Sequence, residues 1–433
     1  MFRPGLLQPL PSSSYLFFHS TTSTTMHDLL ARIQRRAGRM LREIIPYHPH
    51  LRPVGVAPSS AALANQAGSS TAYSEVYPAY TSHLQVPEVF LTSGPSYYEP
   101  VATEELMPPA FVLTLENGRV NVDDINSVAI IAANNQLVGD VSLQFSPVNF
   151  ALATPAENPI FHQSYFTSPR QVEGTVCSLL SGGGAAIGNY YHWMLDSLPR
   201  LHLVQEAGLW DAIDYFLIYD RGHSFALETL RELGVRDEQI IDVKSNSHLQ
   251  ARTLIVTSSV RGGGRHAPRW VGEFMQRSFR PLDTGTPARR FAPLVYVTRR
   301  DASFRQVRNE AEVEAVLREY GFESYALSEL NLREKVALFS GARAVVGPVG
   351  AGLVNILFCQ PGTPLIEFLP RNLIVADYLD LTSRLDMPHY PLISHRDDAS
   401  SQNASADRRD DLTVDIKALR RTLQQAMPEV VTI

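Results

Sequence analysis

The sequence predicts an α/β protein with two domains and an N-terminal extension. Three observations support this fold class. The chain has 433 residues, more than one hydrophobic core usually holds. Short apolar runs alternate with helix-like segments over most of its length. A cluster of Pro, Gly, Thr and Arg at 280–293 separates two such regions. We therefore expect two Rossmann-like domains with mostly parallel sheets, facing a cleft.

The composition is that of an ordinary globular protein. Hydrophobic residues make up 44% and charged residues 19%, and the net charge is −6, so we expect no nucleic-acid partner. The most apolar stretch, 344–359, is too short and too interrupted by glycine and proline to span a membrane. Two cysteines, Cys177 and Cys359, cannot build a disulfide framework, which favours a reducing compartment and a cytoplasmic location.

Residues 1–109 are predicted to form a loosely ordered extension. The part from Arg52 to Pro109 is rich in Ser, Ala, Pro and Tyr and has no sustained period. Before it, residues 26–45 have the pattern of a basic amphipathic helix. This helix is expected either to pack on its own domain or to touch an anionic membrane surface. The second alternative would place the protein at the inner face of the membrane.

Residues 110–285 are predicted to form the first α/β domain. It begins with a small β-meander at 109–145, where β-type runs are separated by Asn-Gly, Asp-Asp and Asn-Asn. A strand at 215–220 and a helix from Ser224 to Gly234 follow. The apolar runs "QIIDV" and "TLIVTSS" have strand length, and we interpret the glycine-rich "SGGG" and "RGGGR" only as loops.

Residues 286–433 are predicted to form the second α/β domain. Its four strands are the runs "LVYVT", "FESYAL", "AVVG" and "LIEFL". Capping boxes, Asn309 with Glu312 and Asn331 with Glu334, begin two of the intervening helices. The segment "VNILF" begins the third helix. This alternation predicts a right-handed, mostly parallel sheet, whose ligands bind beyond the carboxyl ends of its strands.

The turn "GPVGAGL" at 347–353 lies between the third of these strands and its helix. Gly350 and Gly352 have no Cβ, so a ligand can approach the backbone amides. The beginning of a helix also favours anions, because its first amides have no partner inside the helix. The turn therefore has two interpretations, a phosphate-binding site or a purely structural connection.

The segment "GNYYHWMLDSLPRL" at 188–201 has the densest cluster of reactive side chains. Asn189 can cap a helix that places His192 and Asp196 one turn apart on the same face. This spacing lets the carboxylate bond the imidazole, or lets both groups reach one substrate hydroxyl. Pro199 predicts a break in the helix about one turn earlier. The alternative is an ordinary pair on the surface of an amphipathic helix.

Four arginines lie within ten residues after the strand "LVYVT", at positions 299, 300, 305 and 308. The planar guanidinium group suits phosphate oxygens, although a solvated loop paired with Asp301 and Glu310 is the alternative. Glu367 is the only charge in the last strand and could accept bonds from a ribose or pair with an arginine. No Asp-x-Asp motif offers an obvious ligand set for a divalent metal, so we expect no metal and no cofactor.

Three of these segments resemble, in order and spacing, the signature regions of glycosyltransferase family 61. They are "GNYYHWMLDSLPRL", "YVTRRDASFRQVRNEAEV" and "GPVGAGLVNILFCQPGTPLIEF", and the resemblance covers 112–370. The family includes transferases of the capsular-polysaccharide type. The resemblance implies a GT-B fold, with an acceptor-side domain followed by a nucleotide-sugar-binding domain. It also implies an inverting, metal-independent transfer from a nucleotide sugar, usually a UDP-sugar, to a glycan acceptor.

The resemblance also implies roles for individual residues on the donor side. Arg299 and Arg305 would hold the diphosphate, and Glu367 would contact the nucleotide ribose. The backbone donors would come from the glycine turn, namely Gly350, Ala351, Gly352 and Leu353.

On the acceptor side, His192 and Asp196 match the H-x-x-x-D motif of the family. They are therefore candidates for the base that deprotonates the acceptor hydroxyl. The same segment would place Asn189, Tyr191 and Arg200 beside the acceptor.

Asn309 and Glu310 match the "NE" pair of the family pattern, which we interpret as mainly structural. The departure from the pattern is Val349, because the family usually has histidine in G-x-H-G-A-G-L. If that histidine contacts the donor, the donor site of this chain is altered. Two alternatives to a transferase follow. One is a non-catalytic, nucleotide-sugar-binding or scaffolding relative, and the other is a GT-B-shaped sugar-nucleotide epimerase.

Overall fold

The computed structural model describes most of the chain between residues 36 and 428. The described residues are 36–38, 40–41, 44–87, 90, 102–122, 127–144, 152–261, 266–282, 290–370, 373–394 and 411–428. The chain divides into two compact units, residues 1–52 with 162–167, and residues 53–161 with 168–433. Most of the predicted basic helix at 26–45 lies outside the described residues. Among the helices that are described, none has the length and hydropathy needed to cross a bilayer.

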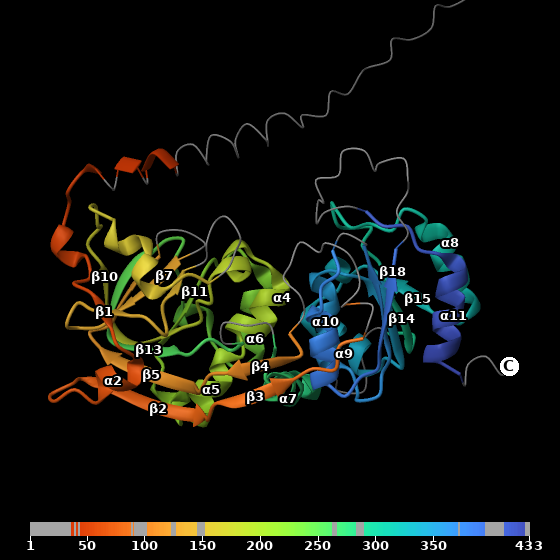
Figure 1. Cartoon of the computed structure of the whole chain (residues 1–433), viewed down its shortest axis with the longest axis horizontal. Helices are drawn as coiled ribbons and strands as arrows, with labels where there is room; N and C mark the ends of the chain where they lie inside the picture. Colours follow the sequence, from red (N-terminus) through yellow and green to blue (C-terminus); the bar gives the residue numbers. More distant parts are fainter. Residues whose placement is uncertain are drawn as a thin grey trace, which may run out of the picture. The chain divides into compact units, whose positions relative to one another are not determined.

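The C-terminal half of the larger unit contains a parallel five-stranded sheet (Figure 1). Its strands are β14 (Leu294–Val297), β15 (Glu323–Tyr325), β16 (Ala344–Pro348), β17 (Leu365–Leu369) and β18 (His389–Ile393). The spatial order is β15-β14-β16-β17-β18, and the chain reverses direction across the sheet between β14 and β16. In such sheets the reversal point opens a crevice at the carboxyl ends of the two strands.

Helices cover both faces of this sheet, with α8 and α11 on one face and α9 and α10 on the other (Figure 1). Their bounds are α8 (Glu310–Glu319), α9 (Leu332–Ser340), α10 (Asp377–Arg384) and α11 (Ile416–Ala426). The expected third helix is a 3-10 helix, η10 (Ala351–Phe358). Side chains alternate between the faces as strand geometry requires, so Ile366 faces the α8 side and Leu365 the α9 side.

The two predicted capping boxes have different outcomes. Asn331 and Glu334 bond each other's backbone at the start of α9, as predicted. The prediction for Asn309 is wrong, because its side chain makes no capping bond at the start of α8. Its amide pairs instead with the backbone of Val414, at 2.9 Å to the carbonyl and 3.0 Å from the N–H. Asn309 therefore anchors the segment that precedes α11.

The other half of the larger unit contains a mixed sheet with eleven strands among the described residues. Four neighbours in it are parallel, in the order β13-β10-β11-β12. They are β10 (Arg170–Ser178), β11 (Tyr215–Ile218), β12 (Ile240–Asp242) and β13 (His248–Thr257). The predicted meander forms β5 (Ala110–Glu116), β6 (Arg119–Asn121), β7 (Ser127–Ile131), β8 (Leu137–Val138) and β9 (Leu143–Gln144).

The expectation of a loosely ordered segment up to Pro109 is wrong for part of it. Strand β2 (Thr71–Tyr77) pairs antiparallel with β5 and extends the mixed sheet. Strands β3 (Tyr80–His83) and β4 (Glu104–Met107) form a separate hairpin. In the segment "TAYSEVY" the exposed Ala72 and Ser74 alternate with the half-buried Thr71 and Tyr73, as in a half-exposed strand, and a register shift between Glu75 and Tyr77 then breaks the alternation.

One cluster of buried apolar side chains includes residues from both halves, such as Trp193 and Leu201 from the first and Val345 and Leu353 from the second. The predicted domain boundary at 285–286 lies outside the described residues. The fold is therefore α/β with parallel strands in both sheets, and the two-domain arrangement around a cleft remains a prediction.

Candidate active site

The helix that carries His192 begins as the sequence predicts. The side-chain oxygen of Asn189 accepts a hydrogen bond from the Tyr191 N–H at 3.0 Å, so Asn189 caps the helix α4 (Tyr190–His192). Asn189 follows β10, and the helix starts near the carboxyl end of that strand. This capping hydrogen bond uses the side-chain oxygen of Asn189 within the protein.

The predicted break near Pro199 is present as a change of helix type. After α4 the chain forms a π-helical segment, η5 (Trp193–Ser197), before α5 (Arg200–Glu206) begins. Pro199 has no amide hydrogen, so the α-helical pattern cannot continue through it. The Leu198 N–H donates to the Trp193 carbonyl at 2.9 Å, the longer spacing typical of a π-turn. Such turns often occur at functional sites.

His192 and Asp196 form a close pair on this helix. His192 Nδ1 lies 2.7 Å from Asp196 Oδ2, and the side chains are 33% and 17% exposed. Of the two expected arrangements, the structure has the one in which the carboxylate bonds the imidazole. A Cβ at Gly184 would overlap the His192 ring, so the "SGGG" segment leaves the space that the ring occupies.

Arg261 is a member of this site that the sequence analysis missed. Its Nε donates to Asp196 Oδ1 at 2.6 Å and its Nη2 to Oδ2 at 2.9 Å. Its guanidinium lies 5.4 Å from the centre of the Tyr191 ring. Because β13 runs parallel to β10, the arginine that follows β13 reaches the helix that follows β10. The position of "RGGGR" at a strand's carboxyl end is the signal that could have identified it.

The pair with Arg261 fixes the charge of Asp196. Burial alone would raise the pKa of the Asp196 carboxyl, but the charge of Arg261 and the hydrogen bond with His192 outweigh burial and hold that pKa well below its ordinary value. Both carboxylate oxygens already accept hydrogen bonds. Asp196 is therefore ionised near neutral pH. Because Nδ1 of His192 bonds Asp196, Nε2 is the ring nitrogen that the pair does not use.

Replacing Arg261 with glutamine is expected to destabilise the protein by about 2–4 kcal/mol near neutral pH, because a carboxylate that is only 17% exposed loses its ion pair. Because folding lowers the pKa of the Asp196 carboxyl, its ionisation stabilises the folded state at pH values above the ordinary pKa of 3.8. This stabilisation is lost as the pH falls below that value. The difference between wild type and Arg261→Gln should therefore narrow below that pH. Urea unfolding at pH 7 and pH 3 measures it.

The control is Arg231→Gln, which removes a two-bond pair with Asp237 whose side chains are 50% and 46% exposed. An exposed pair contributes little, so this variant should unfold almost like wild type. Equal destabilisation by both substitutions would contradict the role assigned to Arg261.

Arg200, which was expected beside the acceptor, is only 4% exposed. Its Nε donates to the Asp196 carbonyl at 3.0 Å, and its Nη1 donates to the Thr257 carbonyl and hydroxyl at 3.2 Å. These bonds hold the π-helical segment against the end of β13. The hydrogen bonds of Arg200 named above are thus made to other groups of the protein. Tyr191 is also buried, at 8% exposed.

On the second sheet, Arg299 and Gly350 meet at the reversal point between β14 and β16. A Cβ at Gly350 would overlap Nη1 of Arg299, so the close approach requires glycine although the backbone there is extended. Nη2 of Arg299 donates to the Phe304 carbonyl at 3.1 Å. Burial and the neighbouring charge of Arg305 lower the pKa of the Arg299 guanidinium to about 10, so it stays charged.

Arg299 forms no ion pair with the residues that the structure describes, although the charge of the Asp301 carboxylate acts on its guanidinium from a longer distance. Within the described part of the chain, no carboxylate lies within ion-pair distance of Arg299, and its buried Nε has no hydrogen-bond partner. Arg305 adopts a left-handed backbone conformation, with a φ of 57°. Its guanidinium lies 5.0 Å from the centre of the Phe304 ring, and that of Arg299 lies 5.6 Å from it. Both arginines therefore gather around one aromatic side chain.

The amides of the glycine turn are not all available to a ligand. The Leu353 N–H donates to the Gly350 carbonyl at 3.0 Å, so this amide is used inside the turn. The amides of Ala351 and Gly352 precede that first bond of η10, where helix amides have no partner in the helix. The predicted anion site therefore has one backbone donor fewer than expected, because the Leu353 amide is already used.

Glu367 is fully buried on β17 and faces the same side of the sheet as Leu365. Its Oε2 lies 2.9 Å from Nε2 of His389 on β18. Burial raises the pKa of the Glu367 carboxyl, although His389 opposes the shift. The other oxygen, Oε1, accepts no hydrogen bond from the residues that the structure describes. The predicted arginine partner is therefore a histidine from a strand that the sequence analysis missed.

Val349 has a structural environment of its own. It is 3% exposed and belongs to the cluster of apolar side chains shared by both halves. Its N–H donates to the Phe368 carbonyl at 2.9 Å. The position at which a histidine was expected is thus part of the core.

Two contacts connect the site residues of the two sheets. The Tyr190 hydroxyl donates to Oδ1 of Asn355 in η10 at 2.9 Å. The ring of Tyr191 meets that of Tyr378 edge-on, with centroids 5.8 Å apart. The residues around His192 and those around Arg299 are therefore brought into one region.

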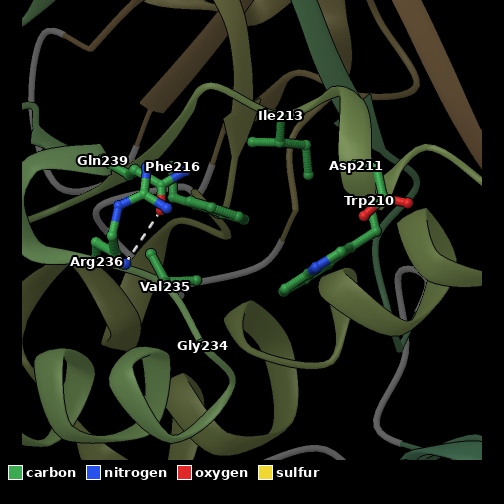
Figure 2. Close-up of a pocket in the computed structure, with 8 residues that line it drawn as sticks. All are labelled: Trp210, Asp211, Ile213, Phe216, Gly234, Val235, Arg236 and Gln239. Carbon is green, nitrogen blue, oxygen red and sulfur yellow. Dashed lines mark hydrogen bonds between the residues drawn. The ribbon is translucent and has the colours of Figure 1, made fainter.

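A separate hollow of about 200 Å³ lies at the amino ends of β11 and β12 (Figure 2). It is lined by Trp210, Asp211, Ile213, Phe216, Gly234, Val235, Arg236 and Gln239. The predicted site residues follow the carboxyl ends of strands, so they lie at the other edge. This hollow contains none of them.

Comparison with known proteins supports the resemblance to glycosyltransferase family 61. The family model described as Glycosyltransferase 61 matches residues 190–366. The matched region contains His192, Asp196, Arg299 and the glycine turn, and ends one residue before Glu367. No curated protein matches the chain. Residues 190–366 thus match glycosyltransferase family 61, and the protein is a glycosyltransferase.

Proposed function

We propose that this glycosyltransferase moves a sugar from a UDP-sugar to a glycan hydroxyl, with inversion at the anomeric carbon and without a metal ion. The product would be a surface or capsular polysaccharide or a glycoconjugate. The proposed arrangement is GT-B, with donor and acceptor on opposite sides of a cleft. The observation that carries the proposal is the charged, half-buried Arg299 against Gly350 at the reversal point of a parallel sheet.

The donor side is suited to a leaving diphosphate. A half-buried guanidinium that forms no ion pair with the residues the structure describes favours an anion, and phosphate oxygens match its geometry. The amides of Ala351 and Gly352 would add neutral donors beside it. These groups stabilise the negative charge that develops on the diphosphate as the glycosidic bond breaks.

The acceptor side is suited to removing a proton. His192 uses Nδ1 to bond Asp196, which leaves Nε2 for the acceptor hydroxyl. In a single displacement, the acceptor oxygen forms a bond to the anomeric carbon as the bond to the diphosphate oxygen breaks. The hydroxyl proton moves to His192 Nε2, and UDP leaves with the electron pair. Asp196, held ionised by Arg261, stabilises the imidazolium.

One observation supports the proposed contact of Glu367 with the ribose: its Oε1 accepts no hydrogen bond from the described part of the chain. Binding there would require the ribose to reach a carboxyl that the protein now covers. Its pair with His389 equally suits a structural role in joining β17 and β18.

A second candidate function is that of a non-catalytic relative that binds a nucleotide sugar. The specific observation in its favour is Val349, an aliphatic core residue at a position where the family usually has histidine. The two functions differ in turnover. A transferase releases UDP only when an acceptor is present, whereas a non-catalytic relative binds the donor without releasing UDP.

The proposal is tested by a thermal-shift screen of UDP-, GDP- and CMP-sugars, each with and without EDTA. At a fixed ligand concentration, a ligand that binds more tightly raises the unfolding temperature more, because the stabilisation grows with the logarithm of the ratio of ligand concentration to Kd. We expect the UDP-sugars to give the largest shifts, and the shifts to be unchanged by EDTA. Stabilisation only by another nucleotide would contradict the donor assignment, and loss of the shift in EDTA would contradict the metal-independent mechanism.

A further inference from the structure

Tyr378 lies between the two groups of site residues and has been assigned no role by the sequence analysis or the family match. It is the second residue of α10 and lies beyond the matched region 190–366. It is 2% exposed. Its hydroxyl donates to the Gly350 carbonyl at 2.6 Å, and its ring contacts Tyr191. One side chain therefore touches both the glycine turn and the helix of His192.

The Gly350 carbonyl is fixed by two donors. It accepts from the Tyr378 hydroxyl and from the Leu353 N–H at 3.0 Å. A peptide group is planar and trans, so its carbonyl and the next N–H point in opposite directions. The bond to Tyr378 therefore also fixes the direction of the Ala351 N–H, which points away from Tyr378.

This peptide needs to be fixed because glycine can rotate more freely than other residues. If the peptide turned over, a carbonyl oxygen would face the position where the N–H now points. A carbonyl dipole repels a phosphate, whereas an N–H attracts it. Burial, followed by the charge of Glu367, raises the pKa of the Tyr378 hydroxyl well above its ordinary value. The hydroxyl therefore remains a donor over the usual pH range.

We propose that Tyr378 is a positioning residue, which holds the Gly350–Ala351 peptide so that the Ala351 N–H is presented to the donor diphosphate. The inference rests on the proposed function and assigns it one more residue. Tyr378 acts through Gly350 and does not itself touch the donor. Its hydroxyl is therefore required for binding the diphosphate and not for binding the nucleoside.

The test is a calorimetric titration of Tyr378→Phe with UDP and with uridine. This variant keeps the ring and removes only the hydroxyl. One buried hydrogen bond corresponds to a loss of about three- to tenfold in UDP affinity, and uridine affinity should stay unchanged. A general loosening of the site would weaken both ligands.

The matched control is Tyr296→Phe. Tyr296 is fully buried in the same half of the molecule, on β14, and its hydroxyl donates to Glu310 Oε1 at 2.9 Å. We expect this variant to bind UDP as wild type does. If it weakened UDP binding as much as Tyr378→Phe, the loss of any buried hydroxyl would explain the effect, and the proposal would be overturned.

The unsubstituted protein gives a second measurement, should Tyr378→Phe not fold. Hydrogen exchange at the Ala351 amide is expected to slow when UDP is added, because the amide then donates to the diphosphate. Unchanged exchange at saturating UDP overturns the proposal, as does equal UDP affinity in wild type and Tyr378→Phe. In both cases UDP still binds, so the proposed function stands. If wild type does not bind UDP at all, both are overturned.

Discussion

His192→Ala is expected to reduce transfer by about 10²–10⁴-fold, the contribution of a positioned general base. The affinity for UDP should be almost unchanged, because the imidazole lies on the acceptor side and the diphosphate on the other. Turnover is measured as UDP released in the presence of a glycan acceptor. Binding is measured by calorimetry with UDP alone.

Asp196→Asn is the matched comparison for this experiment. It keeps the size of the side chain but removes the charge that pairs with His192 and Arg261. We expect it to lower turnover with UDP affinity nearly kept, and to lower turnover less than His192→Ala. Full turnover in His192→Ala would show that the base lies elsewhere. Unchanged turnover in Asp196→Asn would favour a protein that binds the donor without catalysing transfer.

Arg299→Ala is expected to weaken UDP binding by about 10–100-fold, the contribution of a charge-assisted hydrogen bond to a phosphate. The loss should be smaller for uridine, which has no phosphate. At saturating donor, turnover should fall less than in His192→Ala. Calorimetric titration with UDP and uridine measures both affinities.

The neighbouring arginine provides the control for this prediction. Arg300 has a side chain that is 54% exposed and lies 3.7 Å from Glu314. Arg300→Ala removes the same charge from the same loop, so it should bind UDP almost as wild type does. Equal weakening by the two substitutions would mean that the loop attracts UDP only through its overall charge. Equal losses of binding and turnover in Arg299→Ala and His192→Ala would argue against separate donor and acceptor sides.

Local sequence patterns are sufficient to predict the central strands and the approach of Arg299 to the glycine turn. The runs "LVYVT" and "AVVG" are short, apolar and followed by turn residues, so β14 and β16 can be predicted from composition and length. Parallel strands have their carboxyl ends at one edge, which places the residues that follow both strands together. The i,i+4 spacing of His192 and Asp196 likewise fixes their pairing through helix geometry alone.

Partners that are distant in the sequence could not be predicted in this way. Arg261 lies 65 positions after Asp196, and Tyr378 lies 28 positions after Gly350. Both contacts depend on which strands and helices are neighbours, and local patterns do not encode that order. The capping prediction for Asn309 failed for the same reason, because the competing partner, Val414, is 105 positions away.

Strand β18 was missed because its sequence, "HYPLI", contains a proline and no clear alternation. It lies at the edge of the sheet, where Pro391 is tolerated because the outer side of the strand needs no backbone donor. The missed strand carries His389, so the partner of Glu367 was missed with it. An unpredicted edge strand thus changes the interpretation of a predicted site residue.

The most direct test of the central claim is a crystal structure of the protein with UDP bound. We predict diphosphate oxygens within hydrogen-bond distance of the Arg299 guanidinium and of the Ala351 and Gly352 amides, at the carboxyl ends of β14 and β16. A diphosphate bound away from these strand ends, with Arg299 making no contact to it, would contradict the account.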